Sequence, residues 1–381
     1  MPAGIRRCTE VEGACAIHEA PPDIRLCTDL LYVPVEYGAL WGLYEGGVRI
    51  DRDAPLDADA ARQVADLRAS AARVDARFHY LGDVVDHFGH FVVGSLSRLW
   101  PLAAGGGAGT LLLYHGAQDI ERLRGLGFLE PMLGSLGVGL DALRNFRVPV
   151  RLAEVVVAER AFRENHAASR AYDELCKAIG RPWLAGVAVD GEARPAYLSK
   201  LRLPPGSLHK LENEADLVRE LERRGVDVVF PEELDLRAQV RLFAERRTVL
   251  GLTGSALHVC LFAAPERRIL GLNWCRRLNA NLPLFDALNR NQTHYYYADG
   301  VTWIRNDAYA AERDYFLRWS LPDPASVAAA LAERAADVDG IAARDAREAA
   351  GRAGGLLARS VGAAGRGARA GLRRLLRPGA P

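Results

Sequence analysis

The chain of 381 residues is 49% hydrophobic and 25% charged, which is typical of a soluble globular enzyme with two domains and tails. Its 49 Lys and Arg nearly balance its 48 Asp and Glu, which excludes a general binder of polyanions, so we expect no nucleic-acid partner. No apolar run approaches the roughly 20 residues of a membrane span, and the start of the chain lacks an apolar signal region.

The six cysteines form no CxxC pair and no regular framework, which favours a reducing, cytoplasmic compartment. A zinc set drawn from the first 30 residues is a weak alternative because its spacings are irregular: Cys8, Cys15, His18 and Cys27.

The first half of the chain predicts an irregular start followed by an α/β domain. Residues 1–28 carry no regular pattern, and 30–36 predict an edge strand because Pro34 disfavours a central one. Further elements follow in chain order: helices over 57–77, 88–100 and 166–179, and strands over 110–115 and 148–158.

The second half shows a clear alternation of strands and helices. The expected strands cover 196–199, 226–230, 249–252 and 268–272, and the helices between and after them cover 213–224, 234–246 and 255–263. Such alternation is typical of βαβ units in a parallel, doubly wound sheet, with the ligand at the carboxyl ends of the strands. A later helix over 325–335 is expected to pack back on the first domain.

These elements divide the chain into five parts. They are an irregular segment (1–28), an α/β domain (29–185), a Rossmann-like domain (186–310), a helical return segment (311–340) and a basic tail (341–381). The tail carries nine Arg and two carboxylates, a net charge of +7, so the remainder carries −6 against a total of +1. The tail is interpreted as a solvated, disordered segment or as a loose attachment to an anionic membrane surface.

The segment 248–258 is the most informative motif. It indicates an apolar strand, a tight turn at Gly254, and the start of a helix, whose first N–H groups and dipole form an anion site. A plain glycine turn between two core elements is the structural alternative. A nucleophile-elbow hydrolase built on Ser255 would need Gly at positions 253 and 257, where this chain has Thr253 and Leu257.

A second cluster places four basic side chains in a Pro/Gly loop after the strand at 196–199: Lys200, Arg202, His209 and Lys210. Cations at the carboxyl end of a strand suit a diphosphate, which Arg can bind through two hydrogen bonds. A solvated basic loop is the alternative.

The third cluster lies at the entry of the helix predicted over 88–100. It combines Asp83, Asp86, His87, His90 and Arg98. The alternative is a helix whose histidines cap it or lie at its surface, and a His87/His90 metal pair lacks a convincing third ligand.

The order and spacing of these three segments resemble glycosyltransferase family 61. The Asp-His-Phe-Gly-His-Phe…Arg-Leu-Trp segment is similar to the signature of its amino-terminal domain. The Tyr-Leu-Ser-Lys…Asn-Glu-Ala-Asp-Leu and Gly-Ser-Ala-Leu-His…Leu-Phe-Ala segments are similar to its nucleotide-domain signature. The resemblance spans 83–272, and bacterial relatives are commonly described as capsular polysaccharide biosynthesis proteins.

The resemblance implies a GT-B-like architecture, in which two Rossmann-like domains with parallel sheets face a cleft. The domain at 29–185 is then the acceptor side, and the domain at 186–310 binds a nucleotide-sugar donor. The implied reaction transfers a sugar with inversion to a glycan or lipid-linked glycan, without a metal or other cofactor. The implied setting is bacterial surface polysaccharide synthesis in the cytoplasm, with peripheral contact at the inner face of the plasma membrane through the tail.

The family motif also implies roles for individual residues. Lys200, Arg202 and Lys210 hold the diphosphate, and His90 is the candidate base that deprotonates the acceptor, with Asp86 or His87 as second choice. The remaining donor-site residues implied are Thr253, Gly254, Ser255 and His258.

One departure concerns the position four residues after His90, where relatives usually carry an acidic residue and this chain has Gly94. Asp83 or Asp86 then supplies the carboxylate, or His90 is less well oriented. A catalytically silent member that binds nucleotide sugar or glycan within a polysaccharide assembly complex is the alternative function.

Overall fold

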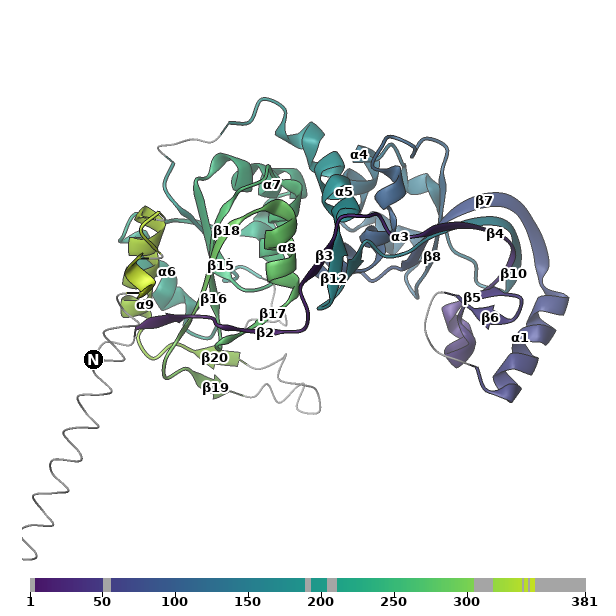
Figure 1. Cartoon of the computed structure of the whole chain (residues 1–381), viewed down its shortest axis with the longest axis horizontal. Helices are drawn as coiled ribbons and strands as arrows, with labels where there is room; N and C mark the ends of the chain where they lie inside the picture. Colours follow the sequence, from purple (N-terminus) through teal and green to yellow (C-terminus); the bar gives the residue numbers. More distant parts are fainter. Residues whose placement is uncertain are drawn as a thin grey trace, which may run out of the picture.

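The structure is a computed structural model that describes residues 4–50, 56–188, 193–203, 211–304, 318–337, 339–341 and 343–346. It is a mixed α/β protein built on two main sheets, with the second half of the chain on the left and most of the first half on the right in Figure 1.

The second sheet contains five parallel strands. Its order is β1-β18-β16-β15-β13-β14, with β1 antiparallel at one edge. The bounds are β1 (Ile5–Arg7), β13 (Ala196–Leu198), β14 (Asp227–Val229), β15 (Thr248–Leu252), β16 (Arg268–Asn273) and β18 (Gln292–Ala298). Numbered in chain order, the parallel strands run 2-1-3-4-5, so the strand order reverses between β13 and β15. In such sheets ligands bind at the carboxyl ends of the strands at this reversal.

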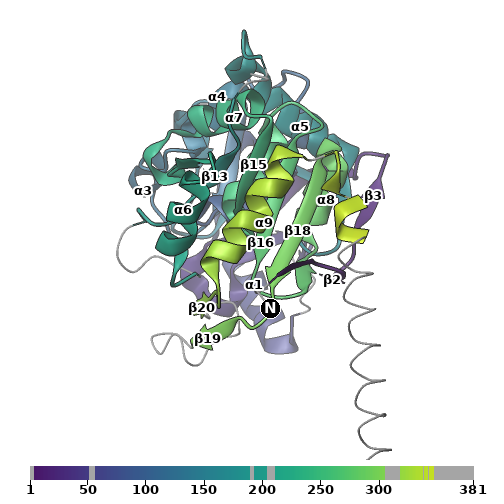
Figure 2. The same cartoon turned by 90° about the vertical axis from the view of Figure 1, so that its left-hand side faces the viewer.

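Helices cover both faces of the second sheet, as expected of a doubly wound fold. One face carries α6 (Glu214–Glu222) and α9 (Pro324–Ala336), and the other carries α7 (Leu236–Glu245), the 3-10 helix η7 (Ser255–Phe262) and α8 (Asn281–Asn289). The expected return of α9 to the first domain is wrong. Its apolar stripe, which includes Val327 and Leu331, packs on α6 and this sheet instead (Figure 2).

The first sheet is mixed rather than wholly parallel, which corrects part of the expected fold. Its order is β6-β5-β4-β10-β7-β8-β9, in which β10, β7, β8 and β9 are parallel and the other strands pair antiparallel. The bounds are β4 (Ile24–Val33), β5 (Gly42–Glu45), β6 (Val48–Arg49), β7 (Ala72–Asp83), β8 (Leu111–His115), β9 (Leu143–Arg144) and β10 (Val150–Ala158). The strand predicted at the edge is internal, because β4 ends at Val33 before Pro34 can interrupt the ladder.

Two helices predicted in the first half are shorter in the structure. The helix expected over 57–77 is α1 (Ala58–Ser70), after which the chain enters β7. The helix expected over 88–100 is divided by Gly94 into α2 (Phe88–Val93), η2 (Ser95–Arg98) and η3 (Trp100–Leu102). The other elements are η1 (Val35–Leu40), α3 (Ile120–Arg124), α4 (Leu129–Ser135), η4 (Leu140–Ala142), β11 (Phe162–Arg163), β12 (Ala167–Ser169), α5 (Arg170–Gly180), η5 (Arg181–Leu184), η6 (Pro231–Glu233), β17 (Arg277–Asn279), β19 (Thr302–Ile304) and β20 (Arg318–Ser320).

The amino-terminal segment, predicted to be irregular, connects the two halves of the molecule. β1 extends the second sheet, β2 (Glu10–Glu12) pairs with β17, and β3 (Ala16–His18) pairs with β12 before the chain enters the first sheet. Its path from left to right is visible in Figure 1. These strands are short and their partners are distant in sequence, so no local pattern indicates them.

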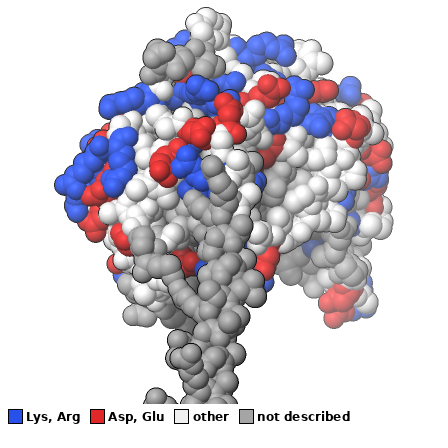
Figure 3. Space-filling view, turned by 60° about the vertical axis from the view of Figure 1, so that its left-hand side comes forward, with Lys and Arg blue, Asp and Glu red and all other residues white. Residues whose placement is uncertain are grey.

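One apolar core continues from the first sheet into the second. It joins residues of α2, α4 and α5 to residues of α7, η7 and α8. The surface carries interspersed charges of both signs (Figure 3), with ion pairs such as Arg246–Asp227 at 2.5 Å. Among the described residues, no helix is long and apolar enough to span a membrane. Asp345, near the start of the basic tail, pairs with the buried Arg334 at 3.0 Å, and the tail from 347 onward lies outside the described residues.

Candidate functional site

The turn after β15 lies at the reversal point of the second sheet. β15 ends at Leu252 and η7 begins at Ser255, directly after Gly254, so the first N–H groups of η7 have no partners within the helix. Thr253 directs its hydroxyl to Asn273 Oδ1 at 2.6 Å, and its own N–H continues the ladder to the Leu272 carbonyl at 3.0 Å. Thr253 is therefore buried and fixes the turn rather than exposing its hydroxyl.

Lys200 comes to the same place from the neighbouring strand. An added Cβ at Gly254 would lie only 3.2 Å from Lys200 Nζ, so the ammonium group sits directly over the turn. The backbone N–H of Lys200 donates to Glu214 Oε1 at 2.9 Å, which anchors the loop after β13 to the first turn of α6. Burial lowers the pKa of Lys200, and the negative charges of Glu214 and Glu232 partly offset this effect.

The other two predicted loop cations have different surroundings. Arg202 is exposed, donates to both carboxylate oxygens of Glu233 at 2.8 and 2.7 Å, and stacks 3.8 Å from the centre of the Phe230 ring. The Arg202 nitrogen that donates to Glu233 must therefore release this carboxylate before it can bind a ligand. Lys210 lies outside the described residues, as does His209.

His258 is buried beneath the turn as a neutral imidazole. Its ring packs edge-on against Phe285 of α8, with ring centres 4.6 Å apart, and its Nδ1 atom is buried without a hydrogen-bond partner. Burial lowers the pKa of His258 to about 3, and the positive charges of His87, Lys200 and His90 act in the same direction. We refer to Lys200, Gly254, Ser255 and His258 as the second-sheet wall of the site.

The opposite side of the site is the start of α2, which follows β7 of the first sheet. His87 precedes the helix and His90 lies in it; both are exposed, with ring centres 4.9 Å apart. We refer to Asp86, His87 and His90 as the α2 wall. It lies at the carboxyl end of a parallel strand, as the turn after β15 does.

Of the two carboxylates expected to compensate for Gly94, Asp83 and Asp86, the second is engaged elsewhere. Asp86 accepts hydrogen bonds from Arg122 of α3 at 2.9 and 3.2 Å. Gly94 closes α2 by donating to the His90 carbonyl at 2.9 Å, and an added Cβ would lie 2.8 Å from that oxygen. An acidic side chain at this position would therefore require the end of α2 to move.

The two walls are in contact. A Cβ added at Gly89 of α2 would lie 3.0 Å from the Ser255 Cβ. Behind them, α5 is bonded to both, because Tyr172 donates to the Val92 carbonyl at 2.5 Å and Lys177 donates to the Leu261 and Ala263 carbonyls at 2.8 and 2.6 Å. The fold thus brings together residues of all three predicted clusters, although His90 precedes Lys200 and Ser255 by more than one hundred residues in sequence.

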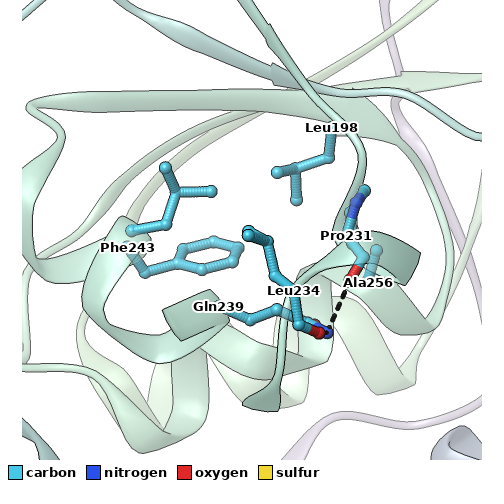
Figure 4. A pocket seen from close by; sticks show the side chains of 7 residues that line it. Leu198, Pro231, Leu234, Gln239, Phe243 and Ala256 are labelled. Atoms are coloured by element: carbon cyan, nitrogen blue, oxygen red, sulfur yellow. Dashed lines mark hydrogen bonds between the residues drawn. The ribbon is translucent and has the colours of Figure 1, made fainter. Parts of the chain in front are cut away.

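A small hollow beside the turn is part of the packing. It is lined by apolar groups from β13, η6, α7 and η7, and Gln239 crosses its floor to donate to the Pro231 carbonyl at 2.9 Å (Figure 4). The hollow is too narrow to hold a water molecule. It therefore stiffens the segment after β14 and offers no ligand site.

The weak zinc set is not gathered by the fold. Cys8 lies against the Cys275 carbonyl beside the second sheet, whereas Cys27 lies in β4 of the first sheet. Among the described residues, no three His, Cys, Asp or Glu side chains are grouped so that they could hold a metal ion.

Comparison with known families gives one match. Residues 88–270 match the family model Glycosyltransferase 61. The match begins at the first residue of α2 and ends in β16, so it includes the whole second-sheet wall and, of the α2 wall, His90. It supports the predicted resemblance to family 61 and, with it, a glycosyltransferase. No curated protein matches the chain.

Three residues that support the site were not singled out from the sequence. Glu214 anchors the Lys200 loop, Asn273 holds Thr253, and Lys177 contacts the far end of η7. Glu214 lies in the Asn-Glu-Ala-Asp-Leu segment that resembles the family signature, but the segment does not indicate its bond to the Lys200 backbone. No motif marks Asn273 or Lys177. The sequence signal available for Glu232, the negative charge near Lys200, is its position just after a predicted strand.

Proposed function

We propose that the protein is an inverting, metal-independent glycosyltransferase that moves a sugar from a nucleotide-sugar donor to a glycan acceptor. The observation that carries this proposal is the contact between Gly89 and Ser255, which places the imidazoles of α2 opposite the Gly254 turn and Lys200. The second-sheet wall is suited to binding an anion, and the α2 wall is suited to proton transfer. The match to family 61 supports sugar transfer as the reaction.

The two walls have different roles in the proposed reaction. His90 accepts the proton of the acceptor hydroxyl as the oxygen attacks the anomeric carbon, and the bond to the diphosphate breaks on the opposite face. Lys200 and the N–H groups of Gly254 and Ser255 stabilise the negative charge that develops on the leaving diphosphate. The neutral ring of His258 lies beneath this position and can hydrogen-bond to the ligand through Nδ1.

The arrangement is consistent with a GT-B-like enzyme, since the carboxyl end of β7 in one sheet meets the carboxyl end of β15 in the other. We further propose that the glycan is a bacterial capsular or surface polysaccharide, built on a free or lipid-linked acceptor at the inner face of the plasma membrane. This setting rests on the family resemblance and on the basic tail.

A panel of nucleotide sugars tests the proposal. The full-length protein should be stabilised by at least one donor, and it should slowly release nucleoside diphosphate from that donor in the absence of acceptor. A ligand at 100 times its dissociation constant stabilises by about 2.7 kcal/mol, which a thermal shift detects easily. Stabilisation without release would favour the silent binding protein, for which the engagement of Asp86 by Arg122 is the supporting observation. No stabilisation by any donor would contradict both.

A further inference from the structure

Arginine side chains mark the amino-terminal edge of the second sheet. At least one Arg lies within the three residues before each of its parallel strands, β13, β14, β15, β16 and β18. Because these strands are parallel, their amino ends meet at one edge, opposite the edge that carries the Gly254 turn. Since neighbouring strands lie about 4.8 Å apart, the five strand starts span about 19 Å. We call these arginines and those next to them the arginine row; in spatial order they are Arg223, Arg224, Arg194, Arg246, Arg247, Arg267, Arg268 and Arg290.

The arginine row carries an excess of positive charge, although the charge of the whole chain is nearly balanced. Three carboxylates pair with the row, and two guanidinium groups share each of them. The pairs are Asp227 with Arg194 and Arg246 (2.5 Å each), Glu220 with Arg223 and Arg224 (2.5 Å each), and Asp339 with Arg247 and Arg268 (3.7 and 2.9 Å). Six guanidinium groups against three carboxylates leave a local charge of +3 in this set. A guanidinium group has five N–H donors, so two groups that share one carboxylate keep donors for other anions.

The arginine row is open to solvent and has no apolar side chains that could anchor a protein partner. The side chains of Arg194, Arg223 and Arg247 are 64%, 68% and 56% exposed. In the described part of the chain, the exposed large apolar side chains lie in the first half or, as Leu201 and Trp303 do, after the carboxyl ends of β13 and β18. Interfaces between proteins usually have a desolvated core rich in apolar and aromatic residues. This edge of the sheet therefore suits a partner that is held by charge alone.

The figures show the same edge. In Figure 2, β16 and β18 start in the upper part of the molecule and run downward. In Figure 3, blue side chains gather along the upper part, with red ones among them.

The basic tail begins beside the arginine row. Asp339, whose carboxylate pairs with Arg247 and Arg268, lies two residues before Ile341, the first residue of the tail. Residues 341–381 carry a net charge of +7. A second basic part of the chain therefore starts at the same edge of the sheet.

We propose that the arginine row is the surface through which the folded protein docks on an anionic lipid bilayer, with the tail as a second contact. Guanidinium groups along a straight edge can bind several lipid phosphates at once, each through two hydrogen bonds, without a pocket. The negative potential of such a surface attracts basic side chains that come within a Debye length of it. Docking through this edge leaves the Gly254 turn, at the opposite edge, free for the donor. This inference rests on the membrane setting of the proposed function and adds the part of the fold that meets the lipid.

Vesicle binding by the full-length protein tests the proposal. Partition coefficients are measured by flotation on vesicles of phosphatidylcholine alone and of equal parts phosphatidylcholine and phosphatidylglycerol. The wild type should bind the anionic vesicles much more tightly, and this preference should weaken as salt is added. Each basic side chain near an anionic surface contributes about fivefold, or about 1 kcal/mol. A variant that combines Arg194→Gln, Arg223→Gln and Arg247→Gln should therefore bind anionic vesicles about 30- to 100-fold more weakly.

Three arginines of the first half of the chain provide a matched control. Arg62, Arg77 and Arg163 are 76%, 64% and 58% exposed, and each is paired with one carboxylate. Their combined substitution by Gln removes the same charge from another face, so binding to anionic vesicles should stay within about threefold of wild type. Thermal unfolding of both combined variants verifies that they fold.

Four outcomes would overturn the proposal. They are equal binding of the wild type to neutral and anionic vesicles, equal losses in the two combined variants, wild-type binding in the arginine-row variant, and binding of poly-glutamate through the row without binding of vesicles. The third outcome would assign the membrane contact to the tail alone, and the fourth would assign the row to an acidic protein. Stabilisation by a nucleotide sugar, measured without vesicles, tests the proposed function separately, so that either proposal can fail without the other.

Discussion

The second-sheet wall and the α2 wall of the site differ in how firmly the surrounding protein holds them. In the second-sheet wall, Lys200 is anchored through Glu214, the turn is fixed by the bond from Thr253 to Asn273, and His258 is buried. In the α2 wall, His87 and His90 are exposed, the first just before and the second within a helix of only six residues. Binding is thus organised by a buried polar framework, and the candidate base is carried by a short surface helix.

Because of this difference, we expect substitutions in the two walls to affect different quantities, affinity in one and rate in the other. Loss of a group from a pre-organised anion site reduces affinity, because the donors are already in place and cost nothing to order. Loss of an exposed base reduces the rate of transfer and leaves binding unchanged. The predictions that follow test this separation, from the largest expected effect to the smallest.

The largest effect is expected for His90→Ala. Removal of a general base typically costs 10²- to 10⁴-fold in rate, so transfer to the acceptor should fall by about that factor. Binding of nucleoside diphosphate should stay within about twofold of wild type, because His90 is not part of the framework that holds Lys200. Initial rates and dissociation constants measured on one preparation check both statements.

Asp86→Asn and His87→Ala are the comparison variants for this prediction. Asp86 is held by Arg122, so its substitution should cost far less rate than that of His90. If His90→Ala retains most of its activity and either comparison variant loses it, the base has been assigned to the wrong residue.

The next effect concerns the two described cations of the loop after β13. Lys200→Met should weaken nucleoside-diphosphate binding by about 10- to 100-fold, which corresponds to a hydrogen bond to a charged group. Arg202→Met should have a smaller effect, since Arg202 is already paired with Glu233. Titration calorimetry at fixed salt separates the two. An equal or larger loss in Arg202→Met would mean that Arg202 exchanges Glu233 for the ligand and is the main phosphate contact.

The two sheets also differ in how much of them the sequence predicts. The sequence predicts β13, β14, β15 and β16, because each is a short apolar segment and a helix separates each from the next, so that the pattern repeats locally. In the first sheet, the helix predicted over 57–77 overlaps the first half of β7, because these residues alternate Ala, Arg and Asp and are largely exposed. The amino-terminal strands were missed because β1 pairs with β18, almost 300 residues later.

The same division holds for the site. The Gly254 turn and Lys200 could be predicted because strand ends in a parallel sheet converge at one edge. Two ion pairs of the site, Asp86 with Arg122 and Arg202 with Glu233, could not be predicted from the sequence. Which charged partner a side chain chooses depends on side-chain geometry. The contact between Gly89 and Ser255 depends on how elements of the two sheets pack together, which no local pattern encodes.

A third prediction tests whether α5 keeps the two walls together. The Lys177 ammonium bonds the carbonyls at the end of η7 and is half-buried, so Lys177→Met leaves polar groups unpaired and should destabilise the protein by about 1–3 kcal/mol. Lys177→Arg keeps the charge and should recover part of this loss. Urea unfolding measures the stability, and nucleotide affinity should fall less in both variants than in Lys200→Met. Wild-type stability in Lys177→Met would show that α5 does not brace the site.

The smallest effect is the contribution of His258 to the pH dependence of stability. Its pKa is lowered to about 3 in the folded protein, whereas an unfolded histidine has a pKa of about 6.5. The unfolded chain therefore takes up a proton first as the pH falls. The stabilisation by the neutral ring is fully present above about pH 6.5 and is lost progressively down to about pH 3, by at most about 1.4 kcal/mol per pH unit.

His258→Gln removes this titration. The free energy of unfolding, measured with urea between about pH 6.5 and 5, should therefore decline less steeply in the variant than in wild type; this range lies above the one where most carboxylates titrate. Parallel profiles for the two proteins would mean that His258 is already protonated in the folded state, and Nδ1 would then be a donor awaiting an anion rather than a neutral group beneath the turn.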